Sequence, residues 1–554
     1  MYTRFLLLLG FSILSYCSYT QSTDEYIVYF KNKDQNTYSL QHPEKYLSAR
    51  AIERRARFNI QYNLLDLPVS TAYIEAVLNT GVSLKYCSKW VNAAIIYNVS
   101  NQQLDALTAL SCVSRVSLLK KNTNLRNISK KEEILLQTPS DIMQLKSTND
   151  FYDYGFAYNQ IQMLSGEKIH NQGYRGEDMV ITVLDAGFIG VDTMQVFKNL
   201  WDNGRILGSR DFVTNGGNVF ASTAYSMHGM AVLSTMGGYL PGKIIGTAPE
   251  ADYYLIRTED PTRECLAEEL YWICGAELAD SIGTDVINSS LGYTTFDSIY
   301  ENHSYSDMDG NTTLITRGAD IAASKGILVV NSAGNSGDNA WYYIGAPADG
   351  DSVLTIGAVY SDSSYASFSS KGPTSDGRVK PEVVAMGGNA AVANLYGGIS
   401  FSSGTSFSSP IIAGLSACLW QAHKNYSNMQ IIKAIIQSAS QVNNFDYNIG
   451  YGIPNFDTAN RIIGINEYQN IADDNFIVFP NPFEDSFTIR SGNLSFVKTI
   501  SVEISNIYGK LVFQKEYKDV LETPIKIQSL KSGIYVLTII SEGKKHPYKI
   551  IKVN

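Results

Sequence analysis

Four polar residues stand out because small residues surround each of them and an apolar run lies beside it. Asp185 follows Val-Leu and precedes Ala-Gly-Phe, and His228 opens the run His-Gly-Met-Ala-Val. Asn335 lies in Ser-Ala-Gly-Asn-Ser-Gly, and Ser406 lies in Gly-Thr-Ser-Phe-Ser-Ser-Pro. Together they could supply an orienting carboxylate, a general base, an oxyanion donor and a nucleophile, which are the groups that acyl transfer requires.

Each residue also has a purely structural interpretation. Ser406 could cap the helix expected after it, His228 could be a structural histidine at a helix start, and Asp185 could cap the turn that follows it. His228 is the best general base among the six histidines, since it alone combines a following glycine with a helix of small residues. The presence of all four motifs favours the catalytic interpretation.

The segments around these residues alternate between short strands and helices. Strands are predicted by apolar or β-branched runs at 179–184, 286–290, 327–331 and 353–357, and helices over 265–281 and 319–325. Continuous apolar strands separated by helices indicate a parallel sheet covered on both faces. Chemistry in such sheets collects at the carboxyl ends of strands, where Asp185 and Asn335 are expected.

The order Asp–His–Ser, together with these motifs, resembles that of the subtilisin-like (subtilase) serine proteases over roughly residues 150–463. The resemblance implies an α/β fold whose parallel sheet carries helices on both faces. It also implies peptide hydrolysis through an acyl-enzyme on Ser406, with His228 as base, Asp185 as its orienting partner and Asn335 as oxyanion donor. Loss of such an asparagine costs about 10²–10³ in turnover in a subtilisin, and we expect a similar scale here.

The same resemblance assigns residues to substrate binding. Ser290, Leu291 and Gly292 are expected to form an edge strand that pairs with the substrate backbone. Ala333 and Gly334 are expected to wall the pocket for the residue before the scissile bond. Strand pairing does not depend on sequence, so specificity would come from the pockets.

The first 21 residues have the features of a secretory signal peptide. Arg4 precedes an apolar run at 5–14, and polar residues follow at 15–22. A buried helix and lipidation of Cys17 are the alternatives, and Tyr16 disfavours the second because that position normally holds a small residue. No later apolar run of about 18 residues is present, so no membrane span is expected.

Residues 22–148 are predicted to form an inhibitory α+β prosegment with a disordered end. Strands and helices interleave over 24–120, and the pattern resembles the prosegments that precede subtilisin-like proteases. Residues 121–150 lose periodicity, which suits cleavage between the prosegment and a peptidase domain at 149–464. One helix of the prosegment carries a cluster of arginines, which we interpret as a solvated helix face: Arg50, Arg54, Arg55 and Arg57.

After a linker predicted at 465–475, short strands separated by turn signals predict a β-sandwich at 476–554. Its motifs Phe-Pro-Asn-Pro-Phe, Asn-Ile-Tyr-Gly-Lys and Leu-Lys-Ser-Gly-Ile-Tyr-Val-Leu resemble the C-terminal sorting domains of the type IX secretion system. The resemblance implies export through the periplasm and the outer membrane of a Gram-negative bacterium, followed by release or attachment at the cell surface. A sandwich that binds carbohydrate or substrate is the alternative.

The amino-acid composition argues against several other classes of function and of fold stabilisation. A net charge of −9, with no basic stripe beyond the arginine cluster, argues against nucleic-acid binding. Six cysteines are too few for a disulfide framework, although Cys87–Cys112 and Cys265–Cys274 are plausible pairs in an oxidising compartment. Cys418 is expected to pack as a small hydrophobe. No cofactor is expected to be required, while the resemblance leaves room for a structural calcium ion at an unassigned site.

The sequence thus predicts a secreted serine endopeptidase that is made as a zymogen and exported by type IX secretion. Its expected partners are protein or peptide substrates, its own prosegment and the secretion machinery. The alternative is a catalytically silent surface-binding or adhesion protein on the same fold, and a third hypothesis is a maturase of other surface proteins. Every catalytic residue is present, which favours an enzyme.

Overall fold

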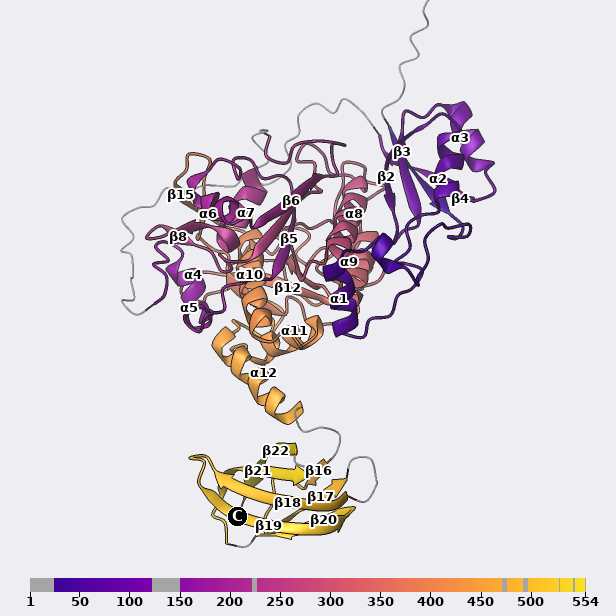
Figure 1. Cartoon of the computed structure of the whole chain (residues 1–554). Helices are drawn as coiled ribbons and strands as arrows, with labels where there is room; N and C mark the ends of the chain where they lie inside the picture. The colour runs from indigo at the N-terminus through magenta and orange to yellow at the C-terminus, as the bar shows by residue number, and fades with distance from the viewer. Residues whose placement is uncertain are drawn as a thin grey trace, which may run out of the picture.

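The computed structural model describes residues 24–121, 150–221, 227–470, 476–491, 497–527, 529–541 and 544–553. They form three regions along the chain, coloured indigo, magenta to orange, and yellow in Figure 1. The predicted signal peptide and most of the predicted cleavage segment lie outside these ranges. No helix within them is long and apolar enough to cross a lipid bilayer.

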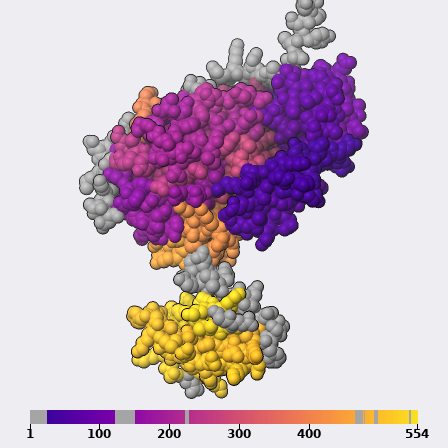
Figure 2. All heavy atoms as spheres, viewed as in Figure 1, coloured from indigo at the N-terminus to yellow at the C-terminus, as the bar shows by residue number. Residues whose placement is uncertain are grey.

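The N-terminal region is an antiparallel sheet in the order β2-β3-β1-β4 with helices packed on it. Neighbouring residues on a strand point to opposite faces. Val28 and Ile96 therefore pack with the helices, while Ile27 and Ile95 pack against the central region. The space-filling view shows the indigo region seated directly on the central body (Figure 2). Its elements are β1 (Glu25–Phe30), α1 (Ala49–Arg57), α2 (Thr71–Leu78), β2 (Ser83–Ser88), β3 (Ala93–Tyr97), α3 (Asn101–Thr108) and β4 (Val113–Lys120).

The central region is built on a seven-stranded parallel sheet in the order β13-β12-β11-β10-β5-β9-β6. The strands from β13 to β5 are buried along their whole length, as expected when helices cover both faces. The α/β class predicted from the sequence is confirmed. The strands are β5 (Val180–Asp185), β6 (Ile206–Asp211), β9 (Asp252–Arg257), β10 (Val286–Ser289), β11 (Leu328–Ser332), β12 (Val353–Val359) and β13 (Val383–Met386).

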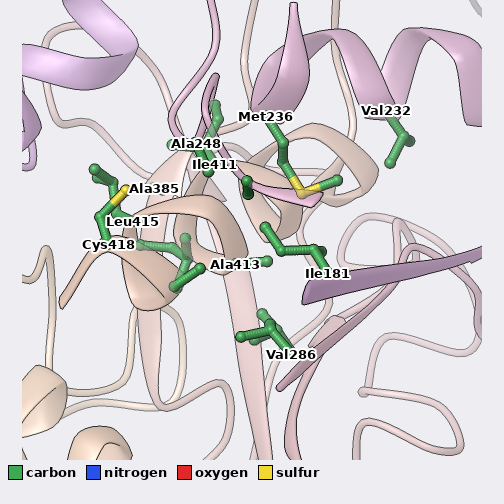
Figure 3. Close-up of a cluster of buried hydrophobic side chains, with 14 of the residues drawn as sticks. Ile181, Val232, Met236, Ala248, Val286, Ala385, Ile411, Ala413, Leu415 and Cys418 are labelled. Carbon is green, nitrogen blue, oxygen red and sulfur yellow. The ribbon is translucent and has the colours of Figure 1, made fainter. Parts of the chain in front are cut away.

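Two layers of helices cover this sheet. α7 (Met227–Gly237) and α10 (Thr405–Ala422) share one core with sheet residues such as Ile181 and Val286 (Figure 3). α8 (Ala267–Ile282) and α9 (Leu314–Ser324) share the opposite core with Leu184 and Ile287. Shorter elements complete the region, namely α4 (Tyr158–Gln162), α5 (Gly166–Asn171), α6 (Lys198–Asp202), β7 (Tyr239–Leu240), β8 (Ile244–Ile245), β14 (Ala390–Ala393), β15 (Ile399–Ser402) and α11 (Asn428–Gln437).

The C-terminal region contains two antiparallel sheets, β16-β17-β20 and β19-β18-β21-β22, which enclose a core of their own. Figure 1 shows this region beyond the end of α12 (Phe456–Asn470). The strands are β16 (Phe476–Phe479), β17 (Ser486–Ser491), β18 (Val497–Asn506), β19 (Leu511–Val520), β20 (Glu522–Lys526), β21 (Gly533–Ser541) and β22 (Lys544–Lys552).

The linker predicted at 465–475 begins later than expected, because α12 continues to Asn470. Phe456, Ala459 and Ile463 are buried on one side of this helix and hold it against the central region. Once such a helix has been nucleated, each further residue adds a hydrogen bond at little cost. The polar composition of the segment therefore did not prevent helix formation.

The cysteine pairs considered from the sequence do not form, and Cys87, Cys112, Cys265, Cys274 and Cys418 are all free thiols. Cys87 lies on β2 and Cys112 directly precedes β4, at opposite edges of the four-stranded sheet. Three strand spacings separate those edges by about 14 Å, beyond the reach of a disulfide. Cys274 is the eighth residue of α8 and lies about 10 Å along the helix axis from the helix end beside Cys265.

The interpretation of the prosegment arginines as a solvated face is wrong for two of them. Arg54 and Arg55 are 3% and 1% exposed, and both donate to Asp280 of α8, at 2.7 Å. Arg55 also pairs with Asp66 at 2.9 Å. The composition of this helix suggests a face exposed to solvent. The face is buried here because carboxylates from other parts of the chain form ion pairs with its arginines. Lysines from both regions complete this buried ion-pair network, through Lys89–Asp280 and Lys325–Asp66, each at 3.0 Å.

Candidate active site

The last residue of β5 is Asp185, whose carboxylate is fully buried at the edge where the parallel strands end. Its Oδ1 accepts hydrogen bonds from the Ala186 backbone N–H at 2.7 Å and from His228 Nδ1 at 2.8 Å. Its Oδ2 is buried and has no hydrogen-bond partner among the described residues. Burial raises the pKa of Asp185, while the charge of His228 and its hydrogen bond act in the opposite direction.

His228 is the second residue of α7, and the residue after it must be small for that helix to approach β5. A Cβ atom at Gly229 would lie 2.4 Å from the Gly187 carbonyl oxygen and 3.0 Å from the Asp185 side chain. Any larger residue would therefore push the helix away and lengthen the bond between Asp185 and His228. This explains physically why a glycine follows the histidine.

The hydroxyl of Ser406 lies in the first turn of α10, and the residue is 9% exposed. Its Oγ donates to the Ser290 carbonyl oxygen at 3.4 Å, and the Ser290 hydroxyl donates to the Ser406 carbonyl oxygen at 2.9 Å. The first backbone N–H groups of a helix have no partners within that helix, and they favour negative charge beside them. Ser406 is thus located where a developing oxyanion would be stabilised.

Asn335 follows β11 and is held by Thr405, a residue that the sequence analysis did not single out. The Asn335 Oδ1 atom accepts from the Thr405 backbone N–H at 2.8 Å and from the Thr405 hydroxyl at 2.9 Å. The Gly334 backbone N–H donates to the same hydroxyl at 3.1 Å. These bonds define Nδ2 as the donor end of the Asn335 amide. The position of Thr405 between a glycine and the candidate nucleophile was the signal that could have found it.

One cavity of about 600 Å³ brings most of the predicted site residues together. His228, Asn335 and Ser406 line it, and Asp185 lies buried behind His228. The predicted substrate-binding residues that line it are Ser290, Leu291, Gly292 and Gly334. Ala333 is not among the lining residues; it is 1% exposed and packs with Ile344 and Ala348.

Further residues line the cavity that the sequence analysis did not assign to it. Trp341 and Tyr343 form an aromatic wall, and the Tyr343 ring stacks on Tyr305 with centroids 4.1 Å apart. Glu259 and Glu264, from the segment that follows β9, bring carboxylates to the cavity. The local sequence does not indicate that they line the cavity, since their position depends on the path of the segment after β9.

The last strand of the predicted prosegment, β4, ends close to the rim of this cavity. Lys120, the last residue of β4, forms an ion pair with Asp260 at 3.0 Å. Arg263 donates to the Lys121 carbonyl oxygen at 2.7 Å. Asp260 and Arg263 belong to the same segment as the cavity-lining Glu259 and Glu264. The end of β4 therefore lies beside the candidate active site.

The described ranges contain no group of three or more His, Cys, Asp or Glu side chains arranged to hold a metal ion. The aspartate-rich segment at 307–311 instead stabilises a turn. Asp309 accepts from the backbone N–H groups of Asn311 and Thr312 at 2.8 Å and 2.7 Å.

Comparison with known proteins identifies the family. Residues 176–452 match the Subtilase family, residues 25–134 match the Peptidase S8 propeptide domain of Bacteroidota, and residues 477–553 match the secretion system C-terminal sorting domain. The chain belongs to the subtilase family. Its three regions are a propeptide, a peptidase domain and a sorting domain.

Curated relatives of the peptidase domain are subtilisins and related proteases. Subtilisin E of Bacillus subtilis is 30% identical over 303 residues, which cover 54% of this chain and 70% of that protein. A subtilisin of Bacillus pumilus is also 30% identical over 303 residues, covering 54% and 97%. The thermostable alkaline protease of Halalkalibacterium halodurans is 26% identical over 324 residues, covering 58% and 74%. The chain is therefore a serine protease made as a zymogen and directed to secretion or the cell surface.

Proposed function

We propose that this protein is a serine endopeptidase that cleaves protein or peptide substrates through an acyl-enzyme on Ser406. The observation that carries the proposal is the hydrogen bond of 2.8 Å between buried Asp185 and His228, together with the cavity that His228 and Ser406 both line. Asp185 holds the proton of His228 on Nδ1, so that Nε2 is the nitrogen that can accept a proton.

In the proposed reaction, His228 Nε2 takes the proton of Ser406 as its Oγ attacks the substrate carbonyl carbon. Asp185 stabilises the imidazolium that forms, and Asn335 Nδ2 and the Ser406 backbone N–H stabilise the oxyanion. His228 then returns the proton to the leaving amine, and a water molecule hydrolyses the acyl-enzyme by the same steps in reverse. Groups of the chain itself handle every proton and charge, so the mechanism requires no cofactor.

Substrate binding along Ser290, Leu291 and Gly292 is proposed to occur through backbone pairing, which supports internal cleavage because it requires no free chain end. The sorting domain supports export across the outer membrane of a Gram-negative bacterium, by way of the periplasm. The prosegment is proposed to occupy the site until the chain is cut after β4. This proposal rests on the ion pair and hydrogen bond that hold Lys120 and Lys121 at the cavity rim.

The test is to express the full chain with Ser406→Ala beside the wild type. If the chain processes itself, the variant should accumulate as full-length precursor while the wild type releases its prosegment. A matched control is Ser324→Ala, which removes an exposed hydroxyl on α9 and should process normally. Normal processing of the Ser406→Ala variant would assign the cut to another protease and would remove this support for the proposal.

A further inference from the structure

A loop at residues 293–303, here called the wall loop, forms part of the cavity and directly follows the residues proposed to pair with substrate. Thr294 of this loop and Gly345 both line the cavity. A Cβ atom at Gly345 would lie 2.8 Å from Thr294 Cγ2, so the two residues pack closely. Tyr293 fixes the start of the loop, because it exchanges backbone hydrogen bonds of 2.8 Å and 3.2 Å with Ala346. The position of Thr294 therefore affects the shape of the cavity.

His303 ends the wall loop and contacts its start. The His303 backbone N–H donates to the Thr294 carbonyl oxygen at 2.9 Å. The His303 and Phe296 rings meet edge to face with centroids 5.3 Å apart, and Phe296 stacks on Tyr293 with centroids 6.3 Å apart. Both of these aromatic side chains are buried. The two ends of the wall loop are therefore held together at His303.

A buried carboxylate attaches His303 to the helix layer. The His303 Nε2 atom lies 2.5 Å from Oε1 of Glu269 on α8, and the two side chains are 14% and 1% exposed. The other carboxylate oxygen of Glu269 accepts a hydrogen bond from the Ile315 backbone N–H in the first turn of α9, at 3.2 Å. The pair of His303 and Glu269 thus fixes the end of the wall loop to the two helices that cover this face of the sheet.

The charge of His303 depends on pH. Burial alone would lower the pKa of His303, but its hydrogen bond to Glu269 and the charges of Glu269, Asp307 and Asp349 raise it above its usual value. These carboxylates face the imidazole from α8, from η4 (Tyr305–Asp307) and from the segment before β12. A histidine whose pKa is raised on folding stabilises the fold below its unfolded pKa, and this contribution is lost as the pH rises through the folded value. The wall loop is therefore held most firmly while the imidazole is protonated.

We propose that His303 is a positioning residue for the protease reaction, which holds the wall loop against α8 so that Thr294 and residues 290–292 keep the geometry that binds substrate. Loss of its positive charge leaves Glu269 buried without this cation, which is costly in a site closed to solvent. Substrate then binds less tightly, whereas the three catalytic residues, on β5, α7 and α10, keep their geometry. The inference rests on the proposed function and adds to it a residue that controls KM rather than kcat.

The experiment uses the secreted, self-processed protein and a peptide that it cleaves, with blocked ends and no titratable side chain. We measure kcat and KM separately between about pH 6 and about pH 9, the range in which a histidine of raised pKa loses its proton. The wild-type KM should rise with pH by about 5-fold or more, the lower end of typical couplings between two sites. His303→Gln should show the high KM at every pH, with kcat close to that of the wild type.

Two further variants separate the charge of His303 from the loop itself. His303→Lys keeps a positive charge throughout this pH range and should show a low KM that does not vary with pH. Tyr300→Ala is the matched control, since it changes a side chain of the same loop that is 95% exposed, and it should keep the wild-type KM at each pH.

The pH dependence of the wild type tests the inference even if a His303 variant is not secreted. A wild-type KM that does not change with pH, or a His303→Gln variant whose KM follows the wild-type pH dependence, would overturn the inference and leave the protease assignment intact. A protein that cleaves no peptide at any pH would instead contradict the proposed function, and the inference with it.

Discussion

The prosegment contacts the peptidase domain in two places that differ in how they use charge. At α1, Arg54 and Arg55 are buried against Asp280 of α8, and all three side chains are nearly inaccessible to solvent. At the cavity rim, Lys120 and Asp260 form an ion pair whose side chains keep 14% and 13% of their surface exposed to solvent. The first contact lies away from the cavity, and the second lies beside it.

The two contacts therefore have different roles. The contact at α1 holds the prosegment on the peptidase domain, and the contact at Lys120 positions the end of β4. A charge buried without its partner costs several kcal/mol, so the network around Asp280 requires the prosegment to dock in one register. The rim pair keeps more contact with solvent than the network around Asp280, so salt screens it more and it can open while the prosegment remains attached. The buried contact therefore acts as the anchor and the rim contact as a release point. A Ser406→Ala precursor should not process itself, so the two contacts can be altered one at a time while the prosegment stays attached.

The largest effect is expected for Asp280→Asn. The substitution leaves Arg54, Arg55 and Lys89 buried without their shared carboxylate, and removing one partner of a buried pair costs about 3–5 kcal/mol. Urea unfolding of the precursor should show a loss of that size. Asp202→Asn, which breaks an exposed pair with Lys198, serves as the control and should cost less than about 0.5 kcal/mol. Equal effects of the two substitutions would show that the network is not an anchor.

Lowering the pH should reduce the difference in unfolding free energy between the wild type and Asp280→Asn. The charges of Lys89, Arg54 and Arg55 outweigh burial and hold the pKa of Asp280 well below its usual range. A carboxyl whose pKa is lowered on folding stabilises the protein above its unfolded pKa and loses that contribution as the pH falls through the folded value. The stability difference between wild type and Asp280→Asn should therefore be constant above about pH 5 and shrink progressively below pH 4. A difference that grew on acidification would have the wrong sign.

Gly283→Ala is expected to have an intermediate effect that depends on the prosegment. Gly283 ends α8 with φ of +90°, where a side chain costs about 1 kcal/mol in strain. A Cβ atom there would also lie 2.8 Å from the Ala51 backbone nitrogen and from the Arg50 side chain. The precursor should therefore lose more stability than the processed enzyme, by about 1 kcal/mol or more. Thermal unfolding of both forms measures the two losses, and identical losses would place the strain in α8 alone.

The smallest effect is expected for Lys120→Gln at the rim. It should cost less precursor stability than Asp280→Asn, because it removes one cation from a partly solvated pair, and the cost should fall at high salt. In a chain with an intact Ser406, the same change should speed release of the prosegment, measured by the time course of processing. A cost as large as that of Asp280→Asn would remove the distinction between anchor and release point.

Local sequence signals could predict the elements that carry the site. Asp185 ends a continuously apolar strand and Asn335 follows another, so the parallel sheet places both at one edge. The sequence also shows the glycine after His228. The physical reason for it, close contact with the 185–187 turn, could be recognised only in the structure. These motifs can be recognised because the small residues and the apolar run stand next to each polar residue in the sequence.

Contacts between distant segments could not be predicted in this way. Arg54 and Asp280 are 226 residues apart, and a run of arginines on a short helix has the same local pattern whether its face is solvated or buried. The separation of Cys87 from Cys112 depends on sheet order, which the spacing of two cysteines does not reveal. Glu259 and Glu264 reach the cavity only through the path of their segment. In each case a tertiary contact between distant segments determines the outcome.

The central claim is that Ser406 is a nucleophile activated by His228, and covalent labelling tests it most directly. The secreted protein is treated with a fluorophosphonate probe, digested, and the labelled peptide is located by mass spectrometry. The account predicts one label on the peptide that contains Ser406, and loss of labelling in His228→Ala although Ser406 is still present. An unlabelled Ser406 in folded, processed protein, or equal labelling without His228, would contradict it.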